Sequence, residues 1–139
     1  MAVDGLTTIR SSYAPEETIN RLEAEIKARG MTVFAHIDHA AGAAGVGLSL
    51  RPTDVLLFGN ARGGTPLMQS IQTIGIDLPL KMLVWRDAAS DTWLSYNDPR
   101  WIAKRHGMGQ EAEATVSAMS AALGALAKIA AGSDEAFKK

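Results

Sequence analysis

The sequence predicts an α+β fold, a single compact domain with a mainly antiparallel sheet of about five strands and helices packed on one face. Two observations lead to this prediction. Two β-prone runs are joined by a short polar turn, as in a hairpin, and strands do not alternate strictly with helices. An Ala-rich, proline-free segment over residues 110–131 predicts a long C-terminal helix. The chain of 139 residues has the length of one domain.

The N-terminal part predicts a strand, a helix and a second strand. Residues 6–11 alternate apolar and β-prone types, which is typical of a short strand. Pro15 favours the first turn of a helix, and Gly30 favours its end. Residues 32–38 alternate again and predict the second strand. The small residues 40–47 have little to bury, so we expect a loop or a frayed strand end there.

The middle of the chain predicts a buried strand followed by a short helix. Residues 54–60 form the most apolar run, which indicates a central strand buried on both faces. Thr65 is the expected helix cap, Pro66 the first helical residue and Gly75 the end of that helix.

The C-terminal part predicts a hairpin and two helices. Residues 80–85 and 92–96 form the hairpin, residues 99–107 a short helix and residues 110–131 the longest helix. The domain is expected to span residues 1–132, followed by a mobile charged tail over residues 133–139.

The composition excludes several classes of function. With 47% hydrophobic residues and no cysteine, the chain is a globular type without disulfides, thiol catalysis or Cys-ligated metal centres. A net charge of -1 predicts no nucleic-acid partner. No uncharged apolar stretch approaches the roughly 20 residues of a membrane helix, so we expect no membrane partner. The N-terminus lacks the features of a signal peptide, which predicts a cytoplasmic location.

The first candidate site is the histidine-containing end of the strand over residues 32–38. Asp38 and His39 are titratable groups beside a glycine-rich segment and are candidate ligand-binding residues. His36 and His39 point to opposite faces of a strand, so they do not form a two-histidine chelate by themselves. His106 is far from both in the sequence, so only the tertiary fold could bring it close to them. The alternative is an ordinary polar strand end.

The second candidate site is the turn over residues 58–66. Asn60, Gly63, Gly64 and Thr65 lie where a strand leads into a helix N-terminus, and free backbone N–H groups there favour an anionic or polar ligand. The alternative is a turn whose glycines serve backbone geometry alone. No P-loop lysine follows, which argues against a mononucleotide.

The hairpin carries the third group of candidates. Trp85 and Trp93 are predicted to pair across the two strands. Tyr96 and Asn97 end the second strand, where a ligand pocket or a subunit interface favours an amphipathic ring. Lys81 lies on the same hairpin.

Several motifs in order carry a resemblance to a known family. They are Phe58-Gly59-Asn60-x-x-Gly63-Gly64-Thr65-Pro66, Asp77-Leu78-Pro79-Leu80-Lys81, and Trp93-Leu94-Ser95-Tyr96-Asn97-Asp98-Pro99. Over roughly residues 6–126 the chain resembles the domain of unknown function 302 family. The resemblance implies a compact α+β domain that forms homodimers, with no established reaction. Among the positions that it marks, His39, Asn60, Lys81, Tyr96 and Asn97 are the hardest to explain by folding alone.

These observations predict a homodimeric domain that binds a small anionic or polar molecule near the turn at Asn60 and His39, without established catalysis. The alternative is a metal-binding or non-covalent haem-binding protein that uses His39 with His36 or His106. A third hypothesis is an enzyme with His39 or Lys81 as its acid–base group.

Overall fold

The computed structural model describes residues 2–132, so the tail that we predicted to be mobile lies outside the described residues. The strands are β1 (Leu6–Ser11), β2 (Thr32–Asp38), β3 (Thr53–Gly59), β4 (Leu80–Arg86) and β5 (Thr92–Asn97). The helices are α1 (Pro15–Ala28), α2 (His39–Gly45), α3 (Ala61–Ser70), α4 (Pro99–Arg105) and α5 (Glu113–Ala131), with the 3₁₀ helices η1 (Gln72–Asp77) and η2 (Gln110–Ala112).

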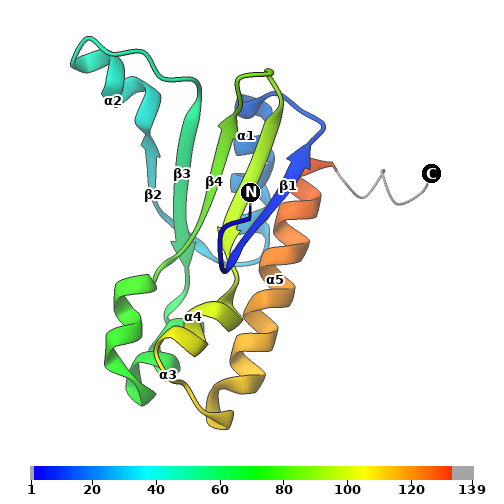
Figure 1. Cartoon of the computed structure of the whole chain (residues 1–139). Helices are drawn as coiled ribbons and strands as arrows, with labels where there is room; N and C mark the ends of the chain where they lie inside the picture. Colours follow the sequence, from blue (N-terminus) through cyan, green and yellow to red (C-terminus); the bar gives the residue numbers. More distant parts are fainter. Residues whose placement is uncertain (1, 133–139) are drawn as a thin grey trace.

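The five strands form one antiparallel sheet in the order β1-β5-β4-β3-β2. Helices α1 and α5 lie side by side across one face of this sheet (Figure 1). The core between them is formed by buried apolar side chains of α1, α5 and the sheet, among them Leu22, Ile26, Phe58, Met82, Leu94 and Leu126. The predicted α+β class, the antiparallel sheet and the long C-terminal helix are confirmed.

A second, smaller apolar cluster lies beyond the end of the sheet. It gathers buried side chains of α3, η1, α4, η2 and the start of α5, namely Leu67, Ile74, Ile102, Ala112 and Val116. Figure 1 shows why α5 joins both clusters, since the helix continues past the end of the sheet toward α3 and α4. Leu78 and Met119 pack against both clusters and mark the junction between them.

The alternation of β4 decides which hairpin side chains meet the core. Leu80, Met82 and Val84 are buried under the helices, so Lys81 and Trp85 point to the opposite face of the sheet. Trp85 lies directly opposite Trp93, and their ring centroids are 6.2 Å apart. The predicted cross-strand tryptophan pair is confirmed.

The segment over residues 40–47 is not the loop or frayed strand that we predicted. Most of it is helical, in α2, because Asp38 provides an N-cap whose carboxylate accepts from the Ala41 N–H at 2.9 Å. Alanine is also the strongest helix former. Helix α2 has no buried residue and stands at the far end of β2 and β3 (Figure 1).

The helix after β3 begins earlier than predicted. Its N-cap is Asn60, not Thr65, since the Asn60 side chain accepts from the Gly63 N–H at 2.8 Å. Pro66 therefore lies inside α3 instead of at its first position. The helix ends at Ser70, and η1 replaces the last turns that we expected up to Gly75.

Candidate ligand-binding site

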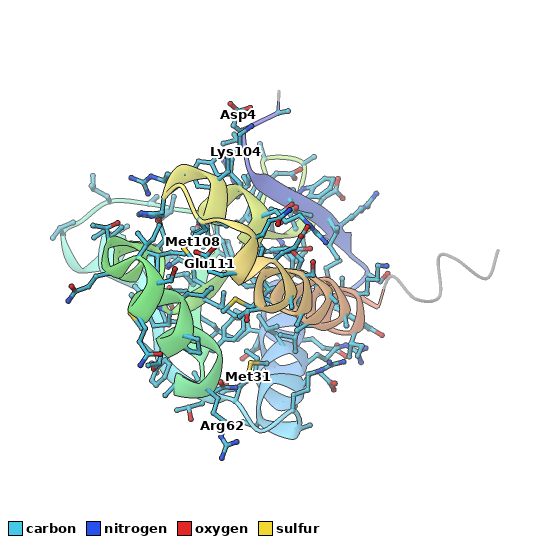
Figure 2. The ribbon with its side chains drawn as sticks, turned by 90° about the horizontal axis from the view of Figure 1, so that it is seen from below. Asp4, Met31, Arg62, Lys104, Met108 and Glu111 are labelled. Carbon is cyan, nitrogen blue, oxygen red and sulfur yellow. The ribbon has the colours of Figure 1, made fainter. Side chains whose placement is uncertain are left out.

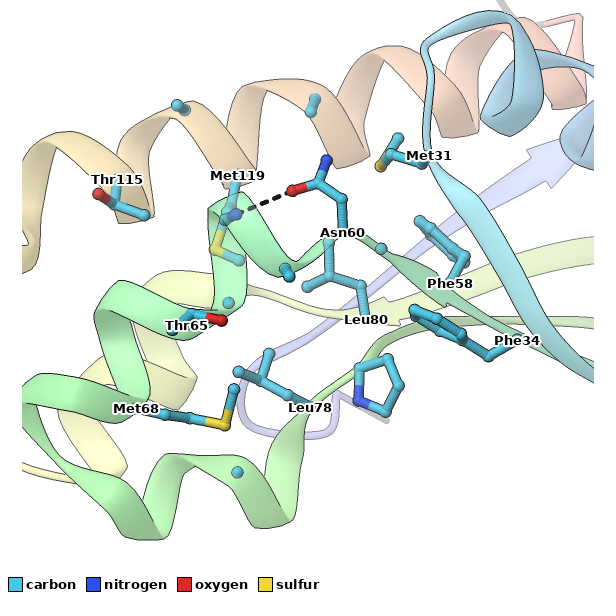
Figure 3. Close-up of a pocket in the computed structure, with 18 residues that line it drawn as sticks. Met31, Phe34, Phe58, Asn60, Thr65, Met68, Leu78, Leu80, Thr115 and Met119 are labelled. Atoms are coloured by element: carbon cyan, nitrogen blue, oxygen red, sulfur yellow. Dashed lines mark hydrogen bonds between the residues drawn. The ribbon is translucent and has the colours of Figure 1, made fainter.

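A cavity of about 490 Å³ opens at the end of the sheet where β3 ends and β4 begins. Its walls come from β2, β3, α3, the η1 to β4 connection and α5 (Figure 3). The large apolar side chains in these walls are Met31, Phe34, Phe58, Met68, Leu78, Leu80 and Met119. Ligand pockets in proteins span roughly 300–1,000 Å³ and are mainly apolar, so this cavity has the size and character of one.

Local backbone features keep the space open. The pairing of β2 with β3 shifts register between Val33 and Ala35, so Phe34 stands at a bulge and contributes to the cavity wall. Gly59 has a φ of 152°, a conformation that favours glycine, and turns the chain out of β3. Asn60 then starts α3 away from the sheet, so α3 faces α5 across the cavity instead of packing on the strands.

Three polar side chains line the cavity. The Asn60 carboxamide oxygen is occupied by the Gly63 N–H, and Figure 3 shows this bond and the Asn60 amide nitrogen beside α5. The other two are Thr65 and Thr115. Within residues 2–132, no protein group is hydrogen-bonded to either hydroxyl or to the Asn60 amide nitrogen. These three groups therefore remain free to bind a ligand.

Within the described residues 2–132, no charged side chain lines the cavity. Arg62, which follows directly after the lining residue Ala61, extends outward from the domain (Figure 2). The N–H of Gly63 is bonded to the Asn60 side chain, and the N–H of Gly64 to the Asn60 carbonyl oxygen at 3.2 Å. An anion in the cavity would lose its hydration without gaining a counter-charge, which is unfavourable. The geometry therefore supports the polar ligand better than the anionic one.

The cavity collects some of the predicted ligand-binding residues and separates others. Asn60, Gly63, Gly64 and Thr65 all line it. His39 and the preceding Asp38 do not, because the antiparallel pairing places Thr32 opposite Gly59 but Asp38 opposite Asp54. The six residue steps from Thr32 to Asp38 correspond to about 20 Å along β2. The expected proximity of His39 to the turn at Asn60 is wrong within one chain.

The predicted hairpin residues lie outside the cavity as well. Lys81 points to the opposite face of β4, and its ammonium donates to the carbonyl oxygens of Asp77 and Pro79 at 3.2 and 2.9 Å. Burial lowers the pKa of Lys81, and the nearby Asp77 charge acts in the opposite direction. Tyr96 packs against the main core beneath α5, where burial raises its pKa. Asn97 ends β5 opposite Leu6.

The three histidines do not meet within one chain. His36 is bonded to Asp54 at 2.7 Å, at the same end of the sheet as His39. His106 ends α4 near the other end of the sheet, where its ring nitrogens contact Asp77 at 2.6 Å and Thr73 at 3.1 Å. In the described residues, no three His, Asp or Glu side chains are placed to share a metal ion. A metal or haem ligated by His39 therefore stays a prediction.

Comparison with known proteins identifies the family. A family model described as "Domain of unknown function DUF302" matches residues 7–126.

The chain is a DUF302 protein.

The crystal structure of an uncharacterized conserved DUF302 protein from Bacillus stearothermophilus has the same fold, with a TM-score of 0.82 and 19% sequence identity. The similarity covers 92% of this chain and 99% of the solved one. Closer in sequence are two proteins named "Fluoride-specific ion channel FluC 1", from Brucella suis biovar 1 and Brucella abortus biovar 1. Both are 45% identical over 128 residues, which is 92% of this chain but 50% and 47% of theirs. The chain spans about half the length of these relatives.

Sequence reasoning on this DUF302 chain missed the apolar part of the cavity. Met31, Met68 and Met119 are three of the six methionines in the sequence. Isolated apolar residues of this kind usually belong to a core, and residues as far apart in sequence as these three carry no signal of a shared cavity. Methionine is flexible and polarizable, so a lining with several methionines adapts to irregular apolar ligands.

The position of the helix cap generates a testable prediction. Asn60→Ala removes the acceptor for the Gly63 N–H and should lower the free energy of unfolding by about 1 kcal/mol. Asn60→Ser, which retains a capping oxygen, should recover most of this loss. Thr65→Ala should have a smaller effect, because Thr65 caps nothing. Urea denaturation followed by circular dichroism measures all three. Equal losses for Asn60→Ala and Thr65→Ala would contradict the assignment of the cap.

Proposed function

We propose that this DUF302 domain binds a small molecule in the cavity between α3 and α5, with the polar part of the ligand bound by Asn60, Thr65 or Thr115. The observation that carries the proposal is the cavity itself, which combines an apolar lining with a few unpartnered polar groups. An open cavity of this kind leaves apolar surface exposed that close packing would otherwise bury. A bound molecule that covers this surface would explain why the cavity exists.

The cavity chemistry favours binding over catalysis. General acid–base catalysis requires a titratable group within hydrogen-bond reach of the reacting atoms. The polar side chains of the lining are one carboxamide and two threonine hydroxyls. His39 and Lys81, the acid–base candidates from the sequence, lie elsewhere in the fold.

The proposal predicts that filling the cavity abolishes ligand retention. Untagged protein is incubated with a small-molecule extract of its host cells, desalted and analysed by native mass spectrometry. The wild type should carry an added mass, and Ala118→Trp, which projects a ring into the cavity, should lose it. Ala114→Trp is the matched control, because Ala114 is exposed on the same helix but does not line the cavity. A wild type without added mass would contradict the proposal, as would equal retention by Ala118→Trp.

We also propose that the domain forms a homodimer through the apolar surface at the α2 end. Four large apolar side chains are exposed there: Ile37 (43%), Val46 (73%), Leu48 (66%) and Leu50 (48%). Clustered exposed apolar side chains are typical of interaction surfaces. The adjoining helix α2 buries none of its residues within one chain, and the adjoining strand β2 is an edge strand. A second copy would cover all of these features.

The dimer surface is tested by two variants, each of which places one charge at an exposed apolar position. Leu48→Asp places a carboxylate in the proposed interface and should convert the dimer to a monomer. Val3→Asp is the control, because Val3 is 62% exposed but lies near β1 at the opposite edge of the sheet. Light scattering after size-exclusion chromatography gives the mass of each. A monomeric wild type would rule out the homodimer, and a dimeric Leu48→Asp would rule out this surface.

A second candidate function comes from the Brucella relatives. We propose that this domain works together with a fluoride channel, because 45% identity extends over about half of proteins with that name. Helix α5, preceded by η2, is long and apolar enough to cross a membrane by length and composition, but the core helix of a globular domain passes the same test. In this structure α5 contributes Leu123 and Leu126 to the core. The cytoplasmic location expected from the sequence stays a prediction.

The second candidate is tested by growth. A strain that lacks this gene should become more sensitive to added sodium fluoride than its parent, and equally tolerant of sodium chloride. A gene with Ala118→Trp should fail to restore tolerance if cavity and channel functions are linked. Unchanged fluoride tolerance on deletion would remove this candidate and leave the cavity proposal intact.

A further inference from the structure

We infer that the ligand of the cavity is an uncharged, mainly hydrocarbon molecule with a hydrogen-bonding group, and that it packs directly on the backbone of α3 at Gly63 and Gly64. This inference rests on the proposed function and adds the chemical class of the ligand. Two observations carry it, namely two helical glycines that the fold does not require and the absence of charge from the cavity lining.

Gly63 and Gly64 are the third and fourth residues of α3, where alanine is more favourable than glycine. Neither has a positive φ. A Cβ on Gly63 would meet the Asn60 side-chain oxygen at 3.5 Å and Met119 at 3.8 Å. A Cβ on Gly64 would meet Leu78 and Met68 at 3.6 and 3.7 Å. These are ordinary van der Waals distances, so neither backbone strain nor packing requires glycine at either position.

Some glycines elsewhere in the chain do have such reasons, whereas Gly42, Gly45 and Gly124 are helical glycines without one. Gly132 ends α5 with a φ of 72°, and a Cβ there would meet the Tyr13 ring at 2.7 Å. Gly63 and Gly64 differ from these helical glycines because both line the cavity. What glycine provides at these two positions is a bare stretch of helix backbone in the cavity wall. A flat or extended molecule can approach that wall more closely than a side chain would allow.

The rest of the lining defines the chemistry of the molecule. Two rings, Phe34 and Phe58, and the flexible side chains of Met31, Met68 and Met119 favour a hydrocarbon body. An ionised group would find no counter-charge among the lining residues. The hydroxyls of Thr65 and Thr115 and the Asn60 amide nitrogen provide partners for a polar group on that body.

Two fluorescent probes that share the same rings and differ by one sulfonate group test the ligand class. N-phenylnaphthylamine is uncharged, and anilinonaphthalene sulfonate carries the same rings with an added sulfonate. We expect wild-type protein to bind the uncharged probe at least about tenfold more tightly, with the difference lost in Ala118→Trp. Fluorescence titration gives both dissociation constants.

Gly64→Ala tests the contact with the α3 backbone. The added methyl should raise the thermal midpoint of unfolding, because it removes a helical glycine, yet weaken binding of the uncharged probe about tenfold. Gly42→Ala in α2 is the matched control, since that helical glycine has open space around its Cβ position and lies far from the cavity. It should raise the midpoint similarly and leave binding unchanged. Gly63→Ala serves as a second variant in case Gly64→Ala does not fold.

The outcomes distinguish a wrong ligand class from a wrong proposed function. If neither probe binds the wild type, both the ligand class and the proposed function are contradicted. Equal or tighter binding of the sulfonate that is lost in Ala118→Trp would retain the cavity as a binding site and overturn the uncharged ligand. Folded Gly63→Ala and Gly64→Ala variants that bind the uncharged probe like the wild type would overturn the backbone contact.

Discussion

The packing of α1 and α5 on one face of the antiparallel sheet is the constraint on which the rest of the molecule depends. An amphipathic sheet must cover its apolar face, and here two helices do so, with Leu22, Leu94 and Leu126 fully buried between the layers. Helix α5 has 19 residues and is about 28 Å long, whereas a strand of seven residues spans about 23 Å. The excess length carries the start of α5 past the sheet. There the helix supports a second apolar cluster, and the cavity lies where the two clusters join.

Much of this architecture was predictable because it is encoded locally. Alternation over β1 and β2, the hairpin of β4 and β5, and the alanine-rich α5 are all visible in short windows of sequence. The errors arose where one side chain decided between two local structures. The Asp38 carboxylate accepts a hydrogen bond from the Ala41 N–H and so starts α2 in a segment of small residues. The Asn60 carboxamide oxygen accepts from the Gly63 N–H and starts α3 in the same way. In both cases Gly and Ala residues left the backbone conformation open, so a single hydrogen bond set the start of the helix.

The candidate site was predictable only in part. The turn from Asn60 to Thr65 was found because its chemistry lies within a few residues. The other candidates lie away from the cavity because of how the strands pair and which face of its strand each side chain occupies. Lys81 follows Leu80 by one residue and so faces away from the cavity that Leu80 lines, and His39 is separated from Asn60 by the length of β2. Polar residues at strand ends do not reveal which end or which face they share until the strand pairing is known. The apolar walls were missed for a related reason, since single methionines and phenylalanines resemble core residues in sequence.

The position of the cavity at the junction of two apolar clusters separates stability from recognition. Apart from Phe58 and Leu80, the residues that line the cavity are not members of the buried core that joins α1 and α5 to the sheet. Met31 and Met119 pack against that core, whereas Met68 packs only against the second cluster, so a substitution at Met68 reshapes the cavity with the least effect on the scaffold. Under the proposed function, a domain built in this way would be able to exchange one ligand for another over evolutionary time without refolding. Such modularity would give one architecture a physical route to many small molecules.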